Sequence, residues 1–460
     1  MKVFFLSVFI FFLVFQVPGM TQAHLLEGGE FVFNEFDQCL SSKNRREINS
    51  RLKTQIAKLD RVGLNKQLNQ EAAVSFGSPI RKSSLQQNQN FYAIRNYVDH
   101  NPSATGAQFG SSNLDYNCGV RTYDTASGYN HQGTDFCSWP FPWHAYENNL
   151  MEVVAAEAGQ VIGIDDGNPD NNCDCINNFD LWNAIYIRHA DGSVAWYGHL
   201  KAGIDKVVGQ MVQKGELLGI VGSSGCSTDP HLHFEVYDSG GNLIDPFFGN
   251  CNSMNSQSWW SSQEEYFVPQ INALLTHFAP PEVGCPAVNE STNFSNCFHP
   301  GETIYIGSYY RDQSAGSITN IRIHRPNGTI QNSWNFTSPQ YYSFSFWYWY
   351  VTLSSTEPYG MWKVEFDYLG VTYDHEFEYT AGDCNCDKAF SLANGNRLSG
   401  GVSNSMLAES DGIIESRQVI GHNSTSPDAV YDSGSSIQLL SGFEVSTSAV
   451  FHALINGCGN

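Results

Sequence analysis

Charged side chains are scarce in this sequence, and the basic ones are the scarcer kind. Asp, Glu, Lys and Arg make up 15% of the 460 residues, with 24 Lys and Arg against 46 Asp and Glu. The resulting net charge of −22 repels nucleic-acid phosphates and anionic lipid head groups. Nucleic acid is therefore excluded as an expected partner.

Long apolar runs are also missing, apart from one at the N-terminus. Lys2 precedes an almost unbroken apolar run over residues 3–17, and a short segment then leads to Ala23. The pattern is typical of a signal peptide, whereas a membrane anchor would need a longer run. We expect residues 1–23 to be a signal peptide cleaved before His24, no membrane span after cleavage, and a secreted or cell-surface protein.

Zinc-finger cysteine spacing is absent as well. Cys-x-Cys pairs occur at residues 173–175 and 384–386, but neither has a second pair at the distance that a structural zinc site needs. All twelve cysteines follow the apolar leader, and an even set in an exported chain predicts disulfides. We therefore expect disulfides, although the sequence leaves their pairing open.

Glycine and aromatic residues, in contrast, are abundant. The 41 glycines and 13% aromatics favour a mainly β protein with many turns, and 460 residues call for more than one domain. Residues 24–90 differ from the rest, because charges are dense between about 43 and 66. Leu52, Ile56 and Leu59 recur there at helical spacing. We expect this N-terminal segment to be helical and to serve as a propeptide or a packing arm.

Short apolar runs broken by Gly, Asn and Asp begin near residue 91. No long helical pattern lies between them, so we predict an antiparallel β-sheet domain with a groove over residues 91–280. A short helical piece is expected near its end, at 269–275. The strand-like runs are residues 151–156, 160–165, 183–189, 193–200, 216–221 and 231–238.

Aromatic-rich alternating strands fill residues 284–380 and predict an Ig-like β-sandwich. Trp347, Trp349 and Tyr350 could form an exposed carbohydrate platform there, but a packed core strand is the better interpretation. Residues 383–460 are rich in Ser, Gly and Asn, with very short strands. This β tail resembles the C-terminal β-stack tails of exported proteins of some Gram-negative bacteria, which makes export machinery an expected partner.

Two short pieces of sequence carry side chains suited to metal chemistry. The first, HQGTD, places His131 and Asp135 four residues apart in a loop with a glycine, and imidazole and carboxylate are both good zinc donors. The second, YGHL, places His199 at the end of the strand-like run 193–200. Each piece alone is a weak signal, because a lone histidine on a strand is more often hydrogen-bonded than a ligand.

A third piece, DPHLHFEV, alternates strictly and therefore predicts a half-buried strand. Leu232 and Phe234 face one way, and His231, His233 and Glu235 face the other. Residues two apart on a strand are about 7 Å from one another. That spacing suits one metal ligand beside one catalytic group better than two ligands of one tetrahedral ion.

Taken together, and in this order, the three pieces resemble the lysostaphin-type zinc endopeptidases, and more closely their beta-lytic branch. That family shows an HxGxD loop, a YGHL-like strand end and an HLHFEV-like strand, which stand here as HQGTDF, WYGHL and DPHLHFEV. The resemblance covers about residues 91–248. It implies the zinc ligands His131, Asp135 and His233 and the catalytic pair His199 and His231.

The resemblance also implies a zinc metalloendopeptidase in which zinc-activated water attacks the peptide bond with help from the two histidines. No HExxH motif supplies a glutamate base, so the histidines must fill that role. The implied substrates are Gly-containing bonds in peptidoglycan peptides or extracellular proteins. The alternatives are a non-catalytic wall-binding protein and an adhesin-type surface protein with a structural zinc site.

Other polar residues receive no catalytic role. The acidic run at residues 165–172 lacks EF-hand spacing, so we interpret it as a surface loop rather than a calcium site. His100, His144, His189 and His277 fit no part of the motif.

Overall fold

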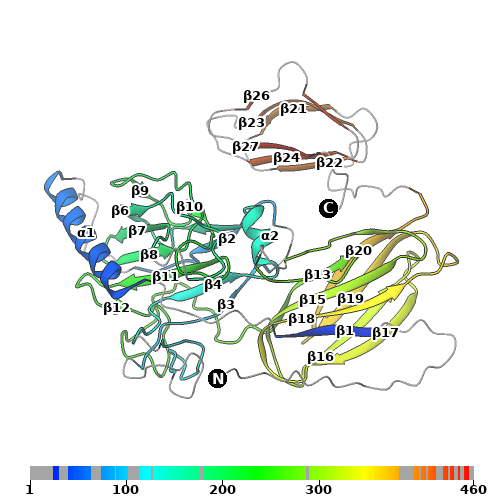
Figure 1. The fold of residues 1–460 in the computed structure, drawn as a ribbon, viewed down its shortest axis with the longest axis horizontal. Coiled ribbons are helices and arrows are strands. Elements are labelled where there is room, and N and C mark those ends of the chain that lie inside the picture. The colour runs from blue at the N-terminus through cyan, green and yellow to red at the C-terminus, as the bar shows by residue number, and fades with distance from the viewer. Residues whose placement is uncertain are drawn as a thin grey trace.

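A computed structural model shows a mainly β protein, as the sequence predicted. It describes residues 24–30, 40–63, 74–86, 88, 90–101, 113–125, 128–175, 180–285 and 290–382, and the backbone of seven short strands between 397 and 454. These parts contain two helices and 27 strands (Figure 1). Neither helix is long and apolar enough to cross a bilayer. The expected signal peptide, residues 1–23, lies outside the described residues.

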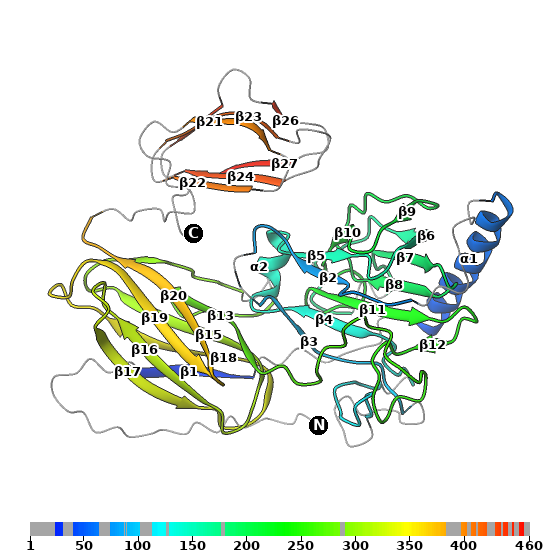
Figure 2. The ribbon, with the colours of Figure 1, turned by 180° about the vertical axis from the view of Figure 1, so that it is seen from behind.

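Antiparallel strands between residues 80 and 244 form the part that carries the predicted site. They are β2 (Ile80–Lys82), β3 (Tyr92–Ile94), β4 (Thr134–Ser138), β5 (Met151–Val154), β6 (Gly159–Asp165), β7 (Ala184–His189), β8 (Val194–Gly198), β9 (Met211–Val212), β10 (Leu217–Ile220), β11 (His231–Tyr237) and β12 (Leu243–Ile244), with the short helix α2 (Pro142–Glu147) after β4. The central sheet has the order β3-β4-β11-β8-β7-β6-β9, with β12 on β11, and a second sheet has the order β10-β5-β2 (Figures 1 and 2).

The main apolar core covers one face of the central sheet. Val153 of β5 and Leu218 of β10 pack there with Leu232 and Phe234 of β11, all 0–1% exposed. Because side chains alternate along a strand, the histidines of β11 point to the opposite face, as the sequence predicted. That second face is called the site face below.

The predicted amphipathic helix is present as α1 (Ser42–Arg61). Its Leu52 and Leu59 are buried against Tyr186 of β7 and Trp196 of β8, both on the site face. Figures 1 and 2 show α1 beside β6 and β7, at one side of the sheet. The helix therefore packs as an integral part of this unit and shares an apolar cluster with it.

Nine strands build two further sheets that face one another. They are β1 (His24–Glu30), β13 (Gln270–His277), β14 (Cys297–Phe298), β15 (Thr303–Gln313), β16 (Ile318–His324), β17 (Ile330–Thr337), β18 (Tyr342–Thr352), β19 (Gly360–Tyr368) and β20 (Val371–Tyr379). The orders are β1-β18-β15-β13 and β14-β20-β19-β16-β17. Trp347 and Trp349 are 6% and 2% exposed in the core between the sheets, so they belong to a core strand and not to a carbohydrate platform.

The prediction of a short helix at residues 269–275 is wrong. β13 occupies this stretch and pairs antiparallel with β15, from Gln270 opposite Arg311 to His277 opposite Tyr305. Intrinsic helix propensity is a weak preference, and a full ladder of hydrogen bonds to a neighbouring strand outweighs it.

An apolar cluster joins the β-sandwich to the site face. Cys137 and Trp139, at the end of β4, pack with Tyr309 and Phe344 of the sandwich. The Trp139 indole N–H also donates to the carbonyl of Tyr310 at 3.0 Å. The sandwich is thus packed directly against the central sheet rather than tethered to it by a linker alone.

Disulfides join distant parts of the chain, as expected for an exported protein. Within the described residues the pairs are Cys118–Cys251, Cys173–Cys285 and Cys175–Cys226. Residues 173–175 therefore form disulfides and no metal site. Cys137 departs from the expectation, because it is a buried free thiol in the apolar cluster at the sandwich. Residues 384–386 lie outside the described residues.

The seven strands of the β tail pair in parallel, whereas the strands of the other sheets pair antiparallel except for β14 with β20. One sheet joins β21-β23-β25, with β26 on β23, and the other joins β22-β24-β27. Their bounds are β21 (Arg397–Val402), β22 (Met406–Ser410), β23 (Ile413–Ile420), β24 (Asp428–Ser433), β25 (Ser436–Leu439), β26 (Glu444–Val445) and β27 (Val450–Leu454). Recognition of this tail by export machinery stays a prediction.

A buried histidine makes the stability of the β-sandwich depend on pH. His277 is fully buried; its Nδ1–H donates to the carbonyl of Thr292 at 2.7 Å, and its Nε2 accepts from the Tyr309 hydroxyl at 3.1 Å. Burial lowers the pKa of His277 to about 3. In the unfolded chain the pKa of a histidine is about 6.5. The stabilisation is therefore complete above pH 6.5 and is lost as the pH falls towards 3.

We predict that lowering the pH from 7.5 to 5.0 removes about 2 kcal/mol of unfolding free energy through His277 alone. Urea unfolding at both pH values measures this loss. The His277→Gln variant should be less stable at pH 7.5 and should show a smaller change between the two values. An identical change in the wild type and the variant would contradict the assignment.

Candidate active site

The predicted site residues meet on three neighbouring strands of the central sheet. In the register of β4, β11 and β8, His233 lies opposite Asp135 on one side and opposite Gly198 on the other. His231 lies two residues before His233 on the same face of β11. His199 follows Gly198 with a left-handed backbone (φ 61°), just where β8 ends.

His131 reaches the site from the loop before β4. Its backbone N–H donates to the carbonyl of Tyr123, and its carbonyl accepts from Asp99. The ring Nδ1 lies 2.7 Å from the carbonyl of Tyr97, which can only accept, so Nδ1 carries the proton. The free electron pair is therefore on Nε2, which lies 3.2 Å from a carboxylate oxygen of Asp135.

Gly133, the glycine of the HxGxD loop, lies where no side chain fits. A Cβ atom at this position would lie 2.7 Å from Cε1 and Nε2 of the His233 ring. Real Cβ atoms do not come so close to a ring, so any other residue would displace the loop or the imidazole. Glycine lets the loop approach β11 closely enough for His131 and Asp135 to reach His233.

His233 is oriented by a carboxylate on its own strand. Its Nε2 lies 2.8 Å from Oε1 of Glu235, and its Nδ1 faces the site. Nδ1 is 2.8 Å from Oδ1 of Asp135 and 3.3 Å from Nε2 of His131. Glu235 is itself buried, and its second oxygen accepts from Arg45 of α1 and from the Tyr237 hydroxyl. Carboxylate–histidine pairs of this kind commonly orient metal ligands.

The ligand atoms of His131, Asp135 and His233 all lie within 4.8 Å of one another, and the three residues are buried. This group is the one the sequence predicted. Zinc bonds of about 2.0–2.1 Å in tetrahedral geometry place ligand atoms roughly 3.3 Å apart. The His131–Asp135 and His131–His233 separations of 3.2 and 3.3 Å match that value, and the His233–Asp135 separation of 2.8 Å is shorter. Two imidazole nitrogens and a carboxylate gathered this closely form a donor set that fits a zinc ion.

The carboxyl group of Asp135 is ionised in this setting. Burial opposes ionisation, but the positive charge of the neighbouring histidines when they are protonated, above all that of His131, outweighs it and holds the pKa of Asp135 well below its usual value. Asn96 also donates to its second oxygen at 2.8 Å. A carboxylate with a fixed orientation is therefore available as a ligand.

His199 and His231 form a second pair beside these three residues. Their rings are 4.6 Å apart, and the His199 ring is 5.8 Å from that of His233. Each is fixed through Nδ1, His199 to the carbonyl of Ser224 at 2.6 Å and His231 to that of Asp229 at 2.8 Å. Within the described part of the chain, His199 Nε2 is buried without a hydrogen-bond partner.

His231 is neutral near pH 7. Burial lowers its pKa to about 4; Asp135 opposes this, and His199 and Arg95 add to it. Its Nε2, 3.7 Å from Asp135 Oδ1, therefore carries a free electron pair that can accept a proton. This is the state that a general base requires.

The five predicted side chains are between 0% and 4% exposed. Electrostatic interactions are stronger at such depth than in water, because the surrounding dielectric is low. Trp182, from the segment before β7, contributes to this burial with its ring 5.6 Å from His199 and 6.3 Å from His233.

Several residues that contribute to the site carry little or no signal in the sequence. Glu235 lies on the predicted face of β11 and contacts His233, and a carboxylate two residues after a ligand is the signal that could have marked it. Asn96, Arg45 and the carbonyl of Tyr97 come from distant positions, and no local pattern marks them.

The residues that received no role do have ordinary structural partners. His100 lies 2.9 Å from Asp245. In the acidic run, Asp166 accepts from the backbone N–H groups of residues 203 and 204, and Asp170 accepts from Ala202 and the Tyr146 hydroxyl. These carboxylates tie surface loops together, as the surface-loop interpretation expected.

Known proteins are similar to the part of the chain that carries the predicted site. The model of peptidase family M23 matches residues 130–246. DD-carboxypeptidase/endopeptidase Mpg of Neisseria meningitidis serogroup B is 48% identical over 58 residues, 13% of each chain. Peptidoglycan DD-endopeptidase ShyC of Vibrio cholerae serotype O1 is 28% identical over 181 residues, 37% of each chain. The matches thus span well under half of these relatives.

Among solved structures, the catalytic domain of the antimicrobial peptidase lysostaphin from Staphylococcus simulans shows 28% identity. The match covers 26% of this chain and 77% of that one, with a TM-score of 0.20. The family match encloses the HxGxD loop and both histidine-bearing strands. Residues 130–246 therefore form a domain of peptidase family M23, the lysostaphin type of metallopeptidase.

Proposed function

We propose that this protein is a secreted zinc metalloendopeptidase that cleaves peptides of the bacterial cell wall. The observation that supports it most directly is the meeting of His131, Asp135 and His233 at ligand distances from one another. His199 and His231 lie beside them with fixed rings. A metal-ligand set with an adjacent acid–base pair is what metal-assisted hydrolysis requires.

The metal is proposed to be zinc because two imidazole nitrogens and one carboxylate are donors that zinc favours. His131 would bind it through Nε2 and His233 through Nδ1, since the other ring nitrogen of each is bonded to Tyr97 or Glu235. When bound, zinc polarises a carbonyl and lowers the pKa of water towards about 7.

His231 and His199 divide the proton transfer and charge stabilisation in this proposal. His231, neutral at pH 7, takes the proton of the attacking water at Nε2 and can pass it to the leaving amine. His199 directs its buried Nε2 into the same space. In its doubly protonated form, the ring keeps its bond from Nδ1 to Ser224 and donates from Nε2 to the carbonyl oxygen, which stabilises the negative charge that develops there. The backbone bonds to Asp229 and Ser224 keep both rings in place during these steps.

Peptidoglycan is the proposed substrate because the similar Vibrio protein is named a peptidoglycan DD-endopeptidase. The similar Neisseria protein is named a DD-carboxypeptidase/endopeptidase. The lysostaphin-type resemblance adds a preference for Gly-containing bonds. Secretion is proposed because the disulfides Cys118–Cys251 and Cys175–Cys226 form in oxidising compartments.

We predict that substitution of the three ligand residues abolishes zinc binding, whereas substitution of the two catalytic histidines does not. Replacing His131, Asp135 or His233 with alanine should remove bound zinc and hydrolysis together. His231→Ala and His199→Ala should keep about one zinc per chain while hydrolysis falls by roughly 10²- to 10⁴-fold. Zinc content by elemental analysis and rates on a peptide substrate measure the two effects.

The His324→Ala variant is the control, because His324 lies on β16 of the sandwich. It should keep both zinc and activity. Zinc lost from His231→Ala but retained by His233→Ala would reverse the assignment of ligand and base.

We also predict a zinc-dependent cut in cell-wall peptides. The mature protein is incubated with purified peptidoglycan and, separately, with a Gly-rich elastin-like peptide, and new termini are identified by mass spectrometry. New termini at peptide bonds of the wall, which disappear after chelation and return with zinc, are the expected result. One zinc per chain with no cleavage of either substrate would favour a non-catalytic wall-binding protein.

A further inference from the structure

The helix α1 is joined to the metal-ligand set by a short chain of hydrogen bonds. Arg45, in its first turn, donates from Nη1 to Oε2 of Glu235 at 2.6 Å and to the Tyr237 hydroxyl at 2.9 Å. The other oxygen of Glu235 accepts from Nε2 of His233 at 2.8 Å. Arg45 and His233 are thus linked through a single carboxylate, although 188 residues separate them in sequence.

This carboxylate depends on Arg45 for its charge balance. The Glu235 side chain is 0% exposed and that of Arg45 is 12% exposed, so water does little to neutralise either. The Arg45 guanidinium also lies over the Trp196 ring, 5.7 Å from its centre, which fixes its position. A buried carboxylate that lost its cation would turn towards other donors or admit water.

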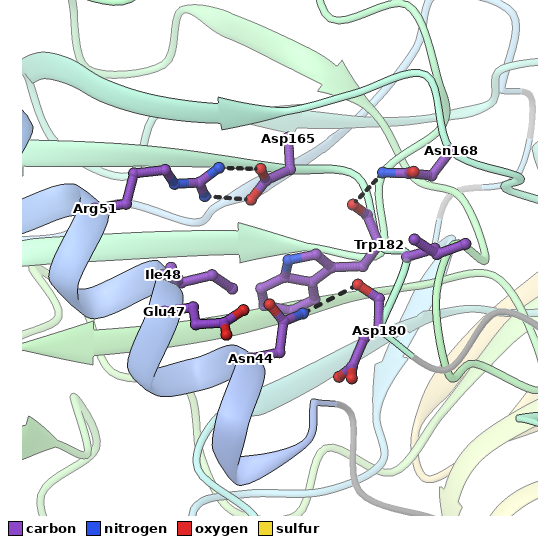
Figure 3. A pocket seen from close by; sticks show the side chains of 9 residues that line it. Asn44, Glu47, Ile48, Arg51, Asp165, Asn168, Asp180 and Trp182 are labelled. Atoms are coloured by element: carbon purple, nitrogen blue, oxygen red, sulfur yellow. Dashed lines mark hydrogen bonds and ion pairs between the residues drawn. The ribbon is translucent and has the colours of Figure 1, made fainter.

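Other contacts hold the start of α1 in the position that Arg45 requires. Ser41 donates from its backbone N–H and its hydroxyl to the Asp180 carboxylate, both at 2.9 Å. Asn44 donates to the carbonyl of Asp180 at 3.0 Å, as Figure 3 shows. Arg51, six residues farther along the helix than Arg45, pairs with Asp165 and is not part of this anchor. One pocket is lined by Asn44, Arg51, Asp165, Asp180 and Trp182. The Trp182 ring also lies beside the rings of His199 and His233.

We propose that Arg45 is a positioning residue of the metal centre, and that α1 is a permanent part of the active enzyme rather than a removable propeptide. Arg45 acts through Glu235, which keeps the proton on Nε2 of His233 and presents Nδ1 to the metal. The inference rests on the proposed role of His233 as a ligand. Partners of this kind typically contribute 10- to 100-fold to metal affinity.

Arg45→Gln in the full-length protein tests the proposal, because glutamine keeps part of the side chain but removes the charge. Its zinc affinity, measured by competition with a chromophoric chelator, should fall roughly 10- to 100-fold. Arg45→Lys, which keeps a cation near Glu235, should recover part of that loss. Arg51→Gln is the matched control, since it removes an ion pair of the same helix that does not reach the metal ligands; its zinc affinity should be unchanged.

A second readout needs no metal. In the metal-free protein, nitrogen NMR of the histidine rings should show the His233 proton on Nε2 in the wild type and in Arg51→Gln. Arg45→Gln should shift His233 towards a mixture of ring forms. Urea unfolding of each variant shows whether it is folded. If Arg45→Gln does not fold, Arg45→Lys is compared with Arg51→Gln in its place.

The outcomes separate this inference from the proposed function. Equal zinc affinity and the same His233 ring form in Arg45→Gln and Arg51→Gln would overturn the role of Arg45, while leaving the ligand set intact. Zinc retained by His233→Ala would instead overturn the ligand set itself. Cleavage of the chain between α1 and β4 on activation, with loss of the helix and full activity, would show that α1 is a propeptide.

Discussion

The site depends on one repeated interaction, in which each histidine has one ring nitrogen bonded to a fixed acceptor. That bond determines which nitrogen carries the proton and where the other one points. Three of the acceptors are backbone carbonyls, which cannot change their charge or turn away without moving the chain. The acceptors are the carbonyls of Tyr97 for His131, Ser224 for His199 and Asp229 for His231, and the carboxylate of Glu235 for His233. The other ring nitrogens therefore converge because the surrounding backbone fixes the positions of the rings.

The backbone is held in place because both faces of the central sheet are packed, each against different elements. On one face, β11 contributes Leu232 and Phe234 to the main core, so the strand cannot rotate without exposing them. On the site face, α1 covers the region of Trp196, and the sandwich covers the region of Cys137. Cys137 lies opposite His231 in the pairing of β4 with β11. The polar groups thus occupy a strip between two apolar clusters, where few water molecules compete for their hydrogen bonds.

The sequence predicted the parts of this arrangement that depend on local periodicity. Alternation along residues 231–237 fixed the faces of β11, and helical spacing of Leu52 and Leu59 located α1. The convergence of His131, Asp135 and His233 followed from motif resemblance, because no spacing rule relates a loop to a strand 98 residues later. Contacts that depend on tertiary packing could not be read. The strand β13 replaces an expected helix because β15 offers it hydrogen-bond partners, and Arg45 reaches Glu235 only because α1 docks on the sheet.

The unit that holds the site is larger than the segment that matches family M23. The match covers residues 130–246 and contains all five predicted site residues. The acceptor for His131, the donor to Asp135 and the cation beside Glu235 come from Tyr97, Asn96 and Arg45, which all precede it. These three groups are hydrogen-bonded to His131, Asp135 and Glu235, and these bonds fix the orientation of the side chains that accept or donate them. In the proposed mechanism the segment that matches the family supplies the reacting groups, and the flanking segments supply the hydrogen bonds that orient them.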